Sequence, residues 1–596
     1  MLFYGDRCRE ADPRQLWDEL DERLALALRM PAGLARHAAL TTSLIEWGVL
    51  LQGVADQAAD ARGFDQEGAA ETALAGRLYA IADELRCSFD SLYWKAAGAI
   101  PATPRPPLPE RVALRSPEGY LHYAVYPETY RAAAASLAMP LAGVIGIRSI
   151  GTSLAAMVAA ASGSAAAMTV RPRGEPYRRH ILADPAIAER LRRADGAVAV
   201  VDEGPGLSGS SFMAVAGWLE AAGVARRRIH VFPSHGGPPG PEASDDTARR
   251  WPRLARHVVP FEDLFLSTVK PAHRLTTWLE QALGPLDGPL RDLSGGAWRS
   301  MVHGLQPPGA ADDPAPVIPA MECRKYAGVA GGRRVLVKFA GLGPIGERKL
   351  AHARALAAAG FTPEPLALLH GFLVERWLPA APRCRLRDLP PPVLLARLAD
   401  YMAFRAVALP ADAAEGAALP ELVAMAVYNT AERLGAAAGD RLARRLASLP
   451  RHGPGLRRCA TDNRLQPFEW LVAADGRLMK TDAVDHAFGH DLIGCQDIAW
   501  DLAGAAVEFD LEPAGREALA HGVERRAGRG ISRDLIRLLE PCYIACELAR
   551  LHFALAMTAG PDRLHLSAAD ARYAQKLRDW LDGTERQRAV GSGEGC

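Results

Sequence analysis

The sequence predicts a multidomain protein of α/β plus α+β class, and three observations lead to that prediction. Residues 38–95 show helical periodicity with few breaks, which predicts a helical N-terminal region. Between residues 110 and 284, short apolar runs are followed by small-residue loops and apolar helices, a pattern typical of a parallel sheet buried on both faces. A Gly-, Pro- and Asp-rich segment then precedes a part of the chain with a different pattern.

These changes divide the 596 residues into four segments. We expect a helical region over residues 1–100, an α/β domain over 110–284, a linker over 285–319 and a second globular part over 320–590. A proline-rich run over 101–109 separates the first two segments. A chain of this length holds about three or four domains, each with a core of its own.

Composition excludes several classes of partner. The formal net charge is +1, from 70 Lys and Arg against 69 Asp and Glu, so no overall field favours nucleic acid or an anionic membrane. No uninterrupted apolar run of about 18 residues predicts a membrane span, and the N-terminus has no basic segment followed by an apolar one. The nine Cys lack metal-ligand spacing and indicate reduced thiols. We therefore expect a cytoplasmic protein that binds small anions, with homodimer formation left open.

An acidic pair follows the most apolar strand of the α/β segment. Residues 197–201 form the strand, Asp202 and Glu203 come next, and a small-residue loop leads into a helix over 214–223. A loop between a strand end and a helix start offers unpaired backbone N–H groups and the positive end of the helix, which favour a phosphate. The serine hydroxyls of this loop add donors. Its phosphate-binding candidates are Ser208, Gly209, Ser210 and Ser211.

This segment resembles the phosphoribosyl-pyrophosphate (PRPP) motif of type I phosphoribosyltransferases, with one extra residue in the loop. The resemblance implies a Rossmann-like parallel sheet, PRPP and Mg²⁺ as substrate and cofactor, and a phosphorylated small molecule as the bound partner. It also implies that Asp202 and Glu203 bind the ribose hydroxyls. The alternative is a generic Gly/Ser turn of an α/β fold.

A second loop lies about fifty residues upstream. The apolar strand over 142–147 ends at Arg148, which resembles the start of the pyrophosphate loop of the same family. Arg148 is predicted to stabilise the leaving group, because guanidinium groups pair with phosphate oxygens in a bidentate fork. The remaining pyrophosphate-binding candidates are Ser149, Ile150, Gly151 and Thr152 of this loop and Arg171 of the following one.

The interval between the two loops is basic. Residues 169–180 contain four arginines together with Pro and Gly, and the equivalent interval in this family often forms a flap that closes over the substrates. The alternative is a solvated arginine-rich turn. Upstream of both loops, residues 121–126 are predicted to be an early strand of the domain.

Beyond the linker, Lys338 stands near the end of an apolar strand, and Glu347 lies in the helix that follows. Only seven of the 70 basic residues are lysine, so a lysine in an apolar strand is notable. The segment resembles the N-lobe of a kinase, in which a strand lysine orients nucleotide phosphates and pairs with a helix glutamate. The run around Glu375 is similar to the hinge of aminoglycoside-phosphotransferase-like kinases. The alternative for Lys338 is a strand lysine whose amine reaches solvent.

A loop further on resembles the catalytic loop of those kinases. Leu465 and Pro467 coincide with its Leu and Pro, which sets Glu469 at the metal-binding Asn and Asp482 at the metal-binding Asp. Both offer oxygen ligands for Mg²⁺. Arg464 occupies the position of the catalytic base, and an arginine cannot accept a proton, so an ordinary kinase mechanism needs Asp462 or another carboxylate. Residues 497–503 resemble a structural segment of the same family.

Two functions are open at this stage. The first is phosphoribosyl transfer from PRPP to an unidentified acceptor with release of pyrophosphate, joined to a kinase-like domain that binds a nucleotide such as ATP. The second is a regulatory protein that senses PRPP or a nucleotide without turnover. The basic residues between the two loops favour the enzyme, because a sensor needs no stabilisation of a leaving group.

Overall fold

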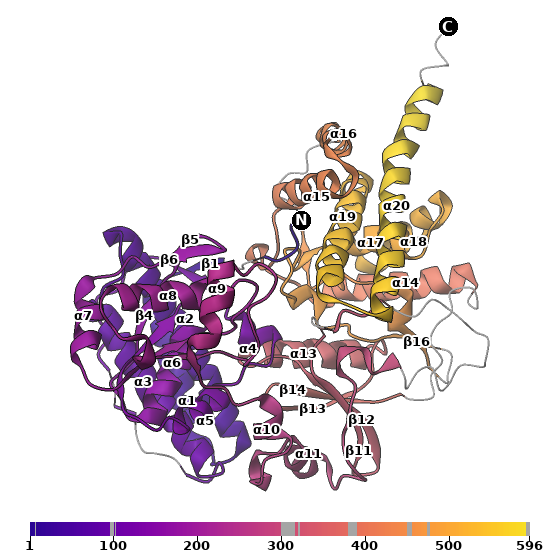
Figure 1. The fold of residues 1–596 in the computed structure, drawn as a ribbon. Coiled ribbons are helices and arrows are strands. Elements are labelled where there is room, and N and C mark those ends of the chain that lie inside the picture. The colour runs from indigo at the N-terminus through magenta and orange to yellow at the C-terminus, as the bar shows by residue number, and fades with distance from the viewer. Residues whose placement is uncertain are drawn as a thin grey trace.

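The computed structural model describes the chain except residues 6–7, 96–99, 102, 300–315, 320–321, 379–389, 450–455, 474–476 and 592–596, and describes no side chains after residue 583. Figure 1 shows an N-terminal half, in indigo to magenta, beside a C-terminal half, in pink to yellow. The antiparallel sheet of the C-terminal half lies next to the N-terminal half, and the helices of the C-terminal half lie beyond it.

Three helices form the predicted N-terminal region: α1 (Pro13–Arg29), α2 (Leu34–Arg62) and α3 (Ala69–Asp90). The carboxylate of Asp12 caps α1 by accepting a hydrogen bond from the N–H of Arg14 at 2.8 Å. By length and composition α2 is apolar enough to cross a membrane, but 72% of its apolar window is buried inside the protein. It is therefore the core helix of this region. A short strand before α1, β1 (Cys8–Ala11), pairs with β2 (Val112–Arg115).

A five-stranded parallel sheet of order β4-β3-β7-β8-β9 forms the α/β domain. Its strands are β3 (Leu141–Ile147), β4 (Met168–Val170), β7 (Ala197–Val201), β8 (Ile229–Phe232) and β9 (Ala255–Arg256). The helices α5 (Pro127–Ala135) and α6 (Gly151–Ser162) pack on the face that carries Ala199 and Val201. The helices α7 (Pro185–Arg193) and α8 (Ser210–Ala221) pack on the face that carries Val198 and Val200. Because both faces are covered, β7 is apolar at every position, as expected for a buried parallel strand.

The segment predicted as an early strand is not one. Residues 118–122 form a short helix, α4 (Glu118–His122), and Ala124 adopts a left-handed conformation with φ of 51°. A strand here could not lie beside β3, because both sides of β3 are already paired, with β4 and β7. Pro127 then starts α5, which follows an extended Tyr126.

A second, antiparallel sheet of order β10-β11-β12-β14-β13 begins the C-terminal half. Its strands are β10 (Arg291–Asp292), β11 (Lys325–Ala330), β12 (Arg333–Phe339), β13 (Pro365–Leu369) and β14 (Phe372–Arg376), and α13 (Pro344–Ala358) follows β12. The predicted linker over 285–319 therefore contributes a strand to this sheet, while residues 300–315 of it lie outside the described part. The helix α9 (Asp245–Arg250) lies between β8 and β9 of the parallel sheet. The helices α10 (Phe261–Phe265) and α11 (Leu275–Leu283) follow β9 and precede the antiparallel sheet.

The rest of the C-terminal half is helical. Its helices are α14 (Pro391–Ala408), α15 (Leu419–Leu434), α16 (Ala436–Ala447), α17 (Ala499–Glu508), α18 (Pro513–Ala527), α19 (Arg533–Met557) and α20 (Pro561–Gly591). Two small antiparallel ladders join β15 (Arg458–Cys459) to β18 (Gln496–Asp497) and β16 (Trp470–Val472) to β17 (Leu478–Lys480).

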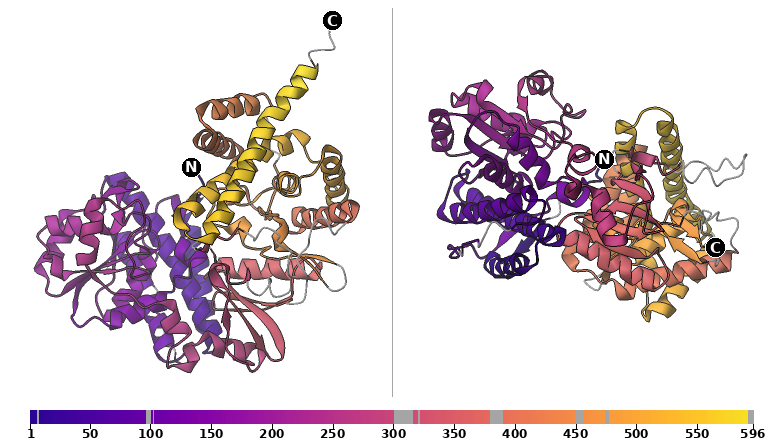
Figure 2. Two further views of the ribbon diagram at one scale, coloured as in Figure 1. Left: turned by 45° about the vertical axis from the view of Figure 1, so that its right-hand side comes forward. Right: turned by 90° about the horizontal axis from the view of Figure 1, so that it is seen from below.

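The first residues of the chain do not belong to the N-terminal helical region. Phe3 is buried in the core of the C-terminal half, and its carbonyl accepts a hydrogen bond from the N–H of Leu492 at 2.8 Å. The N–H of Leu2 donates to Oδ1 of Asn429 at 2.7 Å. Figure 2 accordingly places the N-terminus against the C-terminal half.

Candidate functional site

A cleft of about 560 Å³ opens between the antiparallel sheet and the helices of the C-terminal half. The strands β12 and β14 and the helix α13 contribute to its wall, and so does the segment over 464–491. Leu121, His122 and Tyr123 of the N-terminal half complete the lining. The site is thus assembled from both halves of the chain.

Lys338 lies on β12 inside this cleft and is almost fully buried. Its Nζ lies 2.5 Å from Oδ1 of Asp482 and 2.5 Å from Oδ2 of Asp485. Burial alone would lower the pKa of Lys338, but the two carboxylates outweigh it and hold the pKa well above its usual value. The predicted strand lysine therefore points into the cleft, and the alternative of an amine in solvent is wrong.

The predicted partner of Lys338 is also wrong. Glu347 is exposed on α13, whereas Lys349, two residues further along the same helix, faces the cleft. Its Nζ lies 2.9 Å from Oδ1 of Asp485. Residues two apart on a helix point in different directions, so the inward position of α13 carries a cation where an acid was expected.

The use of lysine marks the cleft more clearly than any motif. Four of the seven lysines in the chain line it: Lys325, Lys338, Lys349 and Lys480. The scarcity of lysine in the sequence applies to Lys349 and Lys480 as much as to Lys338, so it is a signal for these two residues as well. Asp485 has no comparable signal in the sequence.

Glu375 lies on β14 and lines the same cleft. In the ladder, Glu375 is opposite Leu336 and Lys338 is opposite Leu373, so the two charged side chains emerge on the same face of the sheet. Burial raises the pKa of Glu375 to about 7, although Lys338 opposes the effect. The structure thus brings Glu375 to the cleft as predicted, and its role in nucleotide binding stays a prediction.

The loop that resembles a catalytic loop is held from behind. The carboxylate of Asp501 accepts hydrogen bonds from the N–H groups of Asp462 at 2.8 Å and Asn463 at 3.0 Å. The Asp462 side chain is fully buried, bonded to the Tyr401 hydroxyl and 3.2 Å from Nζ of Lys480. Asp462 therefore cannot reach a substrate and does not replace the missing base.

Arg464 lines the cleft instead. Among the residues that the structure describes, no carboxylate forms an ion pair with its guanidinium group. A half-buried arginine without an anionic partner is a ready contact for a bound anion.

Glu469 and Asp482 come together as predicted, and His486 joins them. One ligand atom from each lies within 4.8 Å of the other two, and Nε2 of His486 is buried without a hydrogen-bond partner. Nζ of Lys480 lies 2.5 Å from Oε2 of Glu469, and despite burial this charge lowers the pKa of Glu469 to about 2. Two ionised carboxylates and an imidazole fit a divalent cation: the oxygens suit Mg²⁺, and the nitrogen also allows Mn²⁺.

The wall contributed by the N-terminal half is anchored to His490 of the cleft. Nε2 of His490 lies 2.8 Å from Oε1 of Glu118, and Nδ1 lies 2.6 Å from the Tyr123 hydroxyl. The ring of His122 stacks on that of His490. The sequence did not indicate these contacts: His122 and Tyr123 lie in the segment over 121–126 that was predicted to be a strand, and Glu118 and His490 belong to no motif.

The acidic pair of the N-terminal half lies where predicted, at the carboxyl end of β7 in the middle of the parallel sheet. Burial raises the pKa of Asp202 to about 8 and, together with the neighbouring Asp202 and Glu118, that of Glu203 to about 8. The backbone N–H of Gly119 donates to the Glu203 carboxylate. One or both carboxyls are therefore protonated near neutral pH in the unliganded protein.

The small-residue loop after this pair starts α8, as expected of a phosphate-binding loop. The Ser208 hydroxyl donates to Oγ of Ser210 at 2.9 Å, and the Ser210 hydroxyl donates to the carbonyl of Pro176 at 2.8 Å. Gly209 has φ of 66°, which favours glycine. Ser211 is the second residue of α8 and is half-buried.

Pro176 belongs to the basic interval between the two loops, which forms a hairpin of β5 (Arg173–Glu175) and β6 (Arg178–His180). The hairpin rests on the acidic loop through the bond from Ser210 to the Pro176 carbonyl.

The roles predicted for Arg148 and Arg171 do not agree with the structure. Arg148 is buried, with its Nε 2.9 Å from Oδ1 of Asp56 and its Nη2 bonded to Asp65. Arg171 bonds to Asp56 through Nε at 2.9 Å and through Nη2. Asp56 lies on α2, so the N-terminal helical region already neutralises both guanidinium groups.

The rest of the predicted pyrophosphate loop leads into α6. Ile150 and Thr152 are buried, and Oγ1 of Thr152 has no hydrogen-bond partner. Gly151 lies so close to β7 that a Cβ on it would be 2.5 Å from the Val201 carbonyl oxygen. Ser149 is half-buried at the turn.

Solved structures similar to this one are kinase-like phosphotransferases that match about half of the chain. The choline kinase LicA from Streptococcus pneumoniae is 17% identical, with a TM-score of 0.31, over 44% of this chain and 89% of its own. A spectinomycin phosphotransferase is 12% identical, with a TM-score of 0.33, over 50% of this chain and 99% of its own. A macrolide 2′-phosphotransferase is 15% identical, with a TM-score of 0.33, over 50% and 94%. No protein-family model and no curated protein matches the sequence.

Proposed function

We propose that the cleft of the C-terminal half transfers a phosphoryl group from a nucleoside triphosphate to a small molecule. The observation that supports this most is the contact of Lys338 with Asp482, with Nζ 2.5 Å from Oδ1, in a cleft that also holds Glu469 and His486. A buried cation beside a cluster of metal-ligating carboxylates is what a triphosphate and its divalent cation require. A bound Mg²⁺ would bridge phosphate oxygens and neutralise their charge.

In the structure the lysines of the cleft form ion pairs with its carboxylates. When a nucleotide binds, its phosphates would take the place of the carboxylates as partners of the lysines. Lys338 and Lys349 would contact phosphate oxygens, while Asp482 and Glu469 would hold the cation. Lys338, Asp482 and Glu469 carry the charge that this exchange needs, because the pKa of Lys338 is raised and those of Asp482 and Glu469 are lowered. Glu375 on β14 would then face the nucleotide from the sheet.

Arg464 occupies the position of the catalytic base but would have a different role, the stabilisation of negative charge. Phosphoryl transfer passes through a loose transition state that asks little of a base and much of positive charge around the moving group. Arg464 lines the cleft, where no carboxylate of the described residues pairs with its guanidinium group, and it would stabilise that charge. The acceptor hydroxyl would lose its proton late, after the bond between phosphorus and the leaving oxygen has largely broken.

The experiment uses the full chain with γ-labelled ATP, Mg²⁺ or Mn²⁺ and a panel of alcohols that includes ribose derivatives. Transfer of label that is lost in Asp482→Asn and retained in Glu347→Gln supports the proposal. Glu347 is the matched control because it is an exposed acid of α13 that does not line the cleft. Nucleotide binding without any transfer would reduce the site to a binding module, and no binding at all would exclude it.

A second activity is favoured by the acidic pair at the end of β7. Asp202 and Glu203 lie directly after β7, the central strand of the parallel sheet, and before the loop over 204–209. The hairpin of β5 and β6 contacts the end of that loop through the bond from Ser210 to the Pro176 carbonyl. These features support phosphoribosyl transfer from PRPP, with the pair on the ribose hydroxyls and the loop with the N-terminus of α8 on the phosphate. The bond from C1 of the ribose to pyrophosphate would break as the acceptor nitrogen or oxygen attacks.

The ion pairs of Arg148 and Arg171 with Asp56 weaken the case for phosphoribosyl transfer relative to a regulatory role. With Arg148 and Arg171 paired to Asp56, fewer arginines remain to stabilise the leaving group than the sequence suggested. A regulatory role, in which PRPP or a nucleotide binds without turnover, gains from this.

Pyrophosphate release distinguishes the two. The full chain is incubated with PRPP, Mg²⁺ and a panel of nucleobases and cell extract, beside the Asp202→Asn/Glu203→Gln double variant. Release that needs an acceptor and disappears in the variant supports transfer. Binding of PRPP without release supports the regulatory role, and the absence of binding removes PRPP from consideration.

A further inference from the structure

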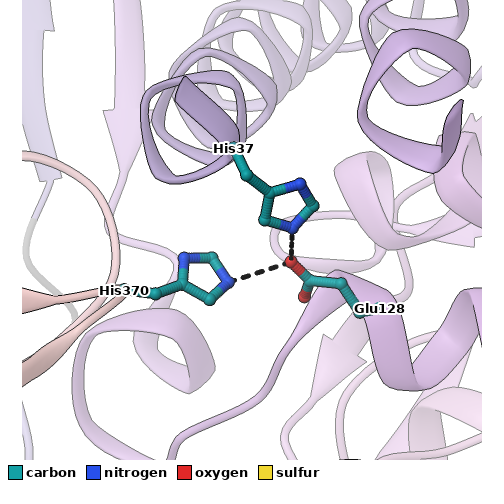
Figure 3. A group of neighbouring side chains, drawn as sticks. All are labelled: His37, Glu128 and His370. Carbon is teal, nitrogen blue, oxygen red and sulfur yellow. Dashed lines mark hydrogen bonds and ion pairs between the residues drawn. The ribbon is translucent and has the colours of Figure 1, made fainter. Parts of the chain in front are cut away.

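Three buried side chains from three distant parts of the chain meet at one point, away from both candidate sites. His37 comes from α2, Glu128 from α5 and His370 from the turn between β13 and β14 (Figure 3). Nε2 of His37 lies 2.7 Å from Oε1 of Glu128, and Nε2 of His370 lies 3.0 Å from the same oxygen. All three side chains are fully buried.

We propose that His37, Glu128 and His370 bind one divalent metal ion of the zinc class, which fastens the helical region, the parallel-sheet domain and the antiparallel sheet to one another. The ligand atoms of the three residues all lie within 4.8 Å of one another, and two imidazoles with a carboxylate form a donor set that zinc takes.

The carboxylate has an unused oxygen. Oε2 of Glu128 is buried and accepts no hydrogen bond from any residue in the described part of the chain, although a buried carboxylate oxygen without a partner is costly. If Glu128 binds through both oxygens, the three side chains supply four donor atoms, the number that a closed zinc site uses. None of the three residues lines the cleft, as expected of a structural site rather than a catalytic one.

The histidines are oriented for this task. Nδ1 of His37 lies 3.1 Å from Oγ of Ser88, which leaves Nε2 pointing at Glu128. Such an outer hydrogen bond commonly fixes the ring of a metal-ligating histidine. His370 has φ of 43°, a left-handed conformation that is uncommon for histidine, and the Tyr126 hydroxyl holds its carbonyl at 2.8 Å.

The spacing needs a small adjustment. Zinc bonds of about 2.0–2.2 Å at tetrahedral angles separate neighbouring ligand atoms by about 3.3 Å. The two distances of 2.7 and 3.0 Å would therefore lengthen by a few tenths of an ångström, which rotation of the side chains supplies.

The test measures bound metal in the full chain after equilibration with Zn²⁺ and removal of excess ion. All proteins carry His486→Gln, so that the cleft triad does not contribute. We expect about one equivalent of Zn²⁺ in this background and its loss in His37→Gln and His370→Asn. Asparagine tolerates the left-handed conformation of residue 370, so that variant spares the turn.

His273→Gln is the matched control. His273 is a buried histidine of the same core whose ring stacks on Phe89, and its Nε2 faces the Phe89 carbonyl instead of Glu128. It should lose stability but keep the metal. With Co²⁺ in place of Zn²⁺, the background and His273→Gln should show the visible absorption of a tetrahedral site and His370→Asn should not. A background that binds no metal, or a His370→Asn variant that keeps it, would overturn the proposal.

Discussion

Oε1 of Glu118 lies 2.8 Å from Nε2 of His490, and this contact joins the short helix α4 of the N-terminal half to the cleft of the C-terminal half. The next residue, Gly119, donates its N–H to the Glu203 carboxylate of the acidic loop. A Cβ at Gly119 would be 2.4 Å from Oε2 of Glu203, so helix and loop are in direct contact. One helix of five residues thus touches both candidate sites.

We expect ligands of the two sites to influence each other through this helix. PRPP with Mg²⁺ should tighten ATP binding in the cleft several-fold, because it fixes the position of Glu203 and with it that of α4. By linkage, ATP should tighten PRPP binding by the same factor. Calorimetric titration of each ligand with and without the other measures the factor, which should approach one in Glu118→Ala. An unchanged factor in that variant would exclude α4 as the connection.

Removing the amine of Lys338 should abolish phosphoryl transfer. In Lys338→Met, we expect kcat/KM to fall by at least about 100-fold, because the phosphates lose their buried cation. The stability of the unliganded protein should fall too, since Asp482 and Asp485 would face each other without Nζ between them. Kinetics and thermal unfolding test both effects. Lys576→Met, which removes a lysine outside the cleft, should leave kcat/KM unchanged.

Arg464 should act on the rate more than on binding. Arg464→Ala is expected to lower kcat by about 100-fold or more and to leave the Kd for ATP nearly unchanged, as for a guanidinium group that contacts the moving phosphoryl group. Arg464→Asp restores the residue type expected of a base and should be no more active than Arg464→Ala. Higher activity in the aspartate variant would mean that the cleft works by general base catalysis.

The acidic pair should make stability fall as pH rises. Both carboxyls have a folded-state pKa of about 8, above the value of an exposed carboxyl, so between about pH 4 and 8 the folded protein holds more protons than the unfolded one. The stabilisation is complete below the unfolded pKa and is lost as pH rises through 8.

The Asp202→Asn/Glu203→Gln variant should lack this loss. It should be more stable than the wild type by at least about 1 kcal/mol at pH 9 and similar to it at pH 5. Urea unfolding at several pH values measures the difference, and a difference that does not change with pH would contradict the assignment.

Asp56 should be important for stability because it pairs with the buried Arg148 and the half-buried Arg171. Asp56→Asn leaves the guanidinium groups of Arg148 and Arg171 with less negative charge, and we expect a loss of about 3 kcal/mol in the free energy of unfolding. Asp60→Asn is the control, because Asp60 is exposed and its pair with Arg173 is worth at most about 1 kcal/mol. Equal effects of the two changes would show that burial of the pair is not decisive.

Much of the architecture could be predicted from local patterns. The strand over 197–201 and the acidic pair after it, the strand of Lys338 and the convergence of Glu469 with Asp482 all follow from apolar runs and motif spacing, which local sequence encodes. The strand predicted over 121–126 was wrong because pairing in the sheet, rather than the segment itself, decides whether an extended run becomes a strand.

Contacts between distant segments account for the remaining differences. Nothing near Arg148 indicates that Asp56 and Asp65 will neutralise it, and nothing near Lys338 indicates Asp485. His37, Glu128 and His370 are separated by 91 and 242 residues, so only the packing of three regions brings them together.

The attachment of Phe3 to the helices of the C-terminal half bears on how the chain is made and handled. A ribosome releases these first residues long before Asn429 and Leu492 exist, so the last half of the protein finishes folding only when its oldest segment returns to it. A fragment that begins after the parallel-sheet domain would expose the apolar residues that contact Phe3 and remove the two hydrogen bonds between Leu2 and the Asn429 amide. Supplying residues 1–5 as a separate peptide should therefore restore solubility to such a fragment.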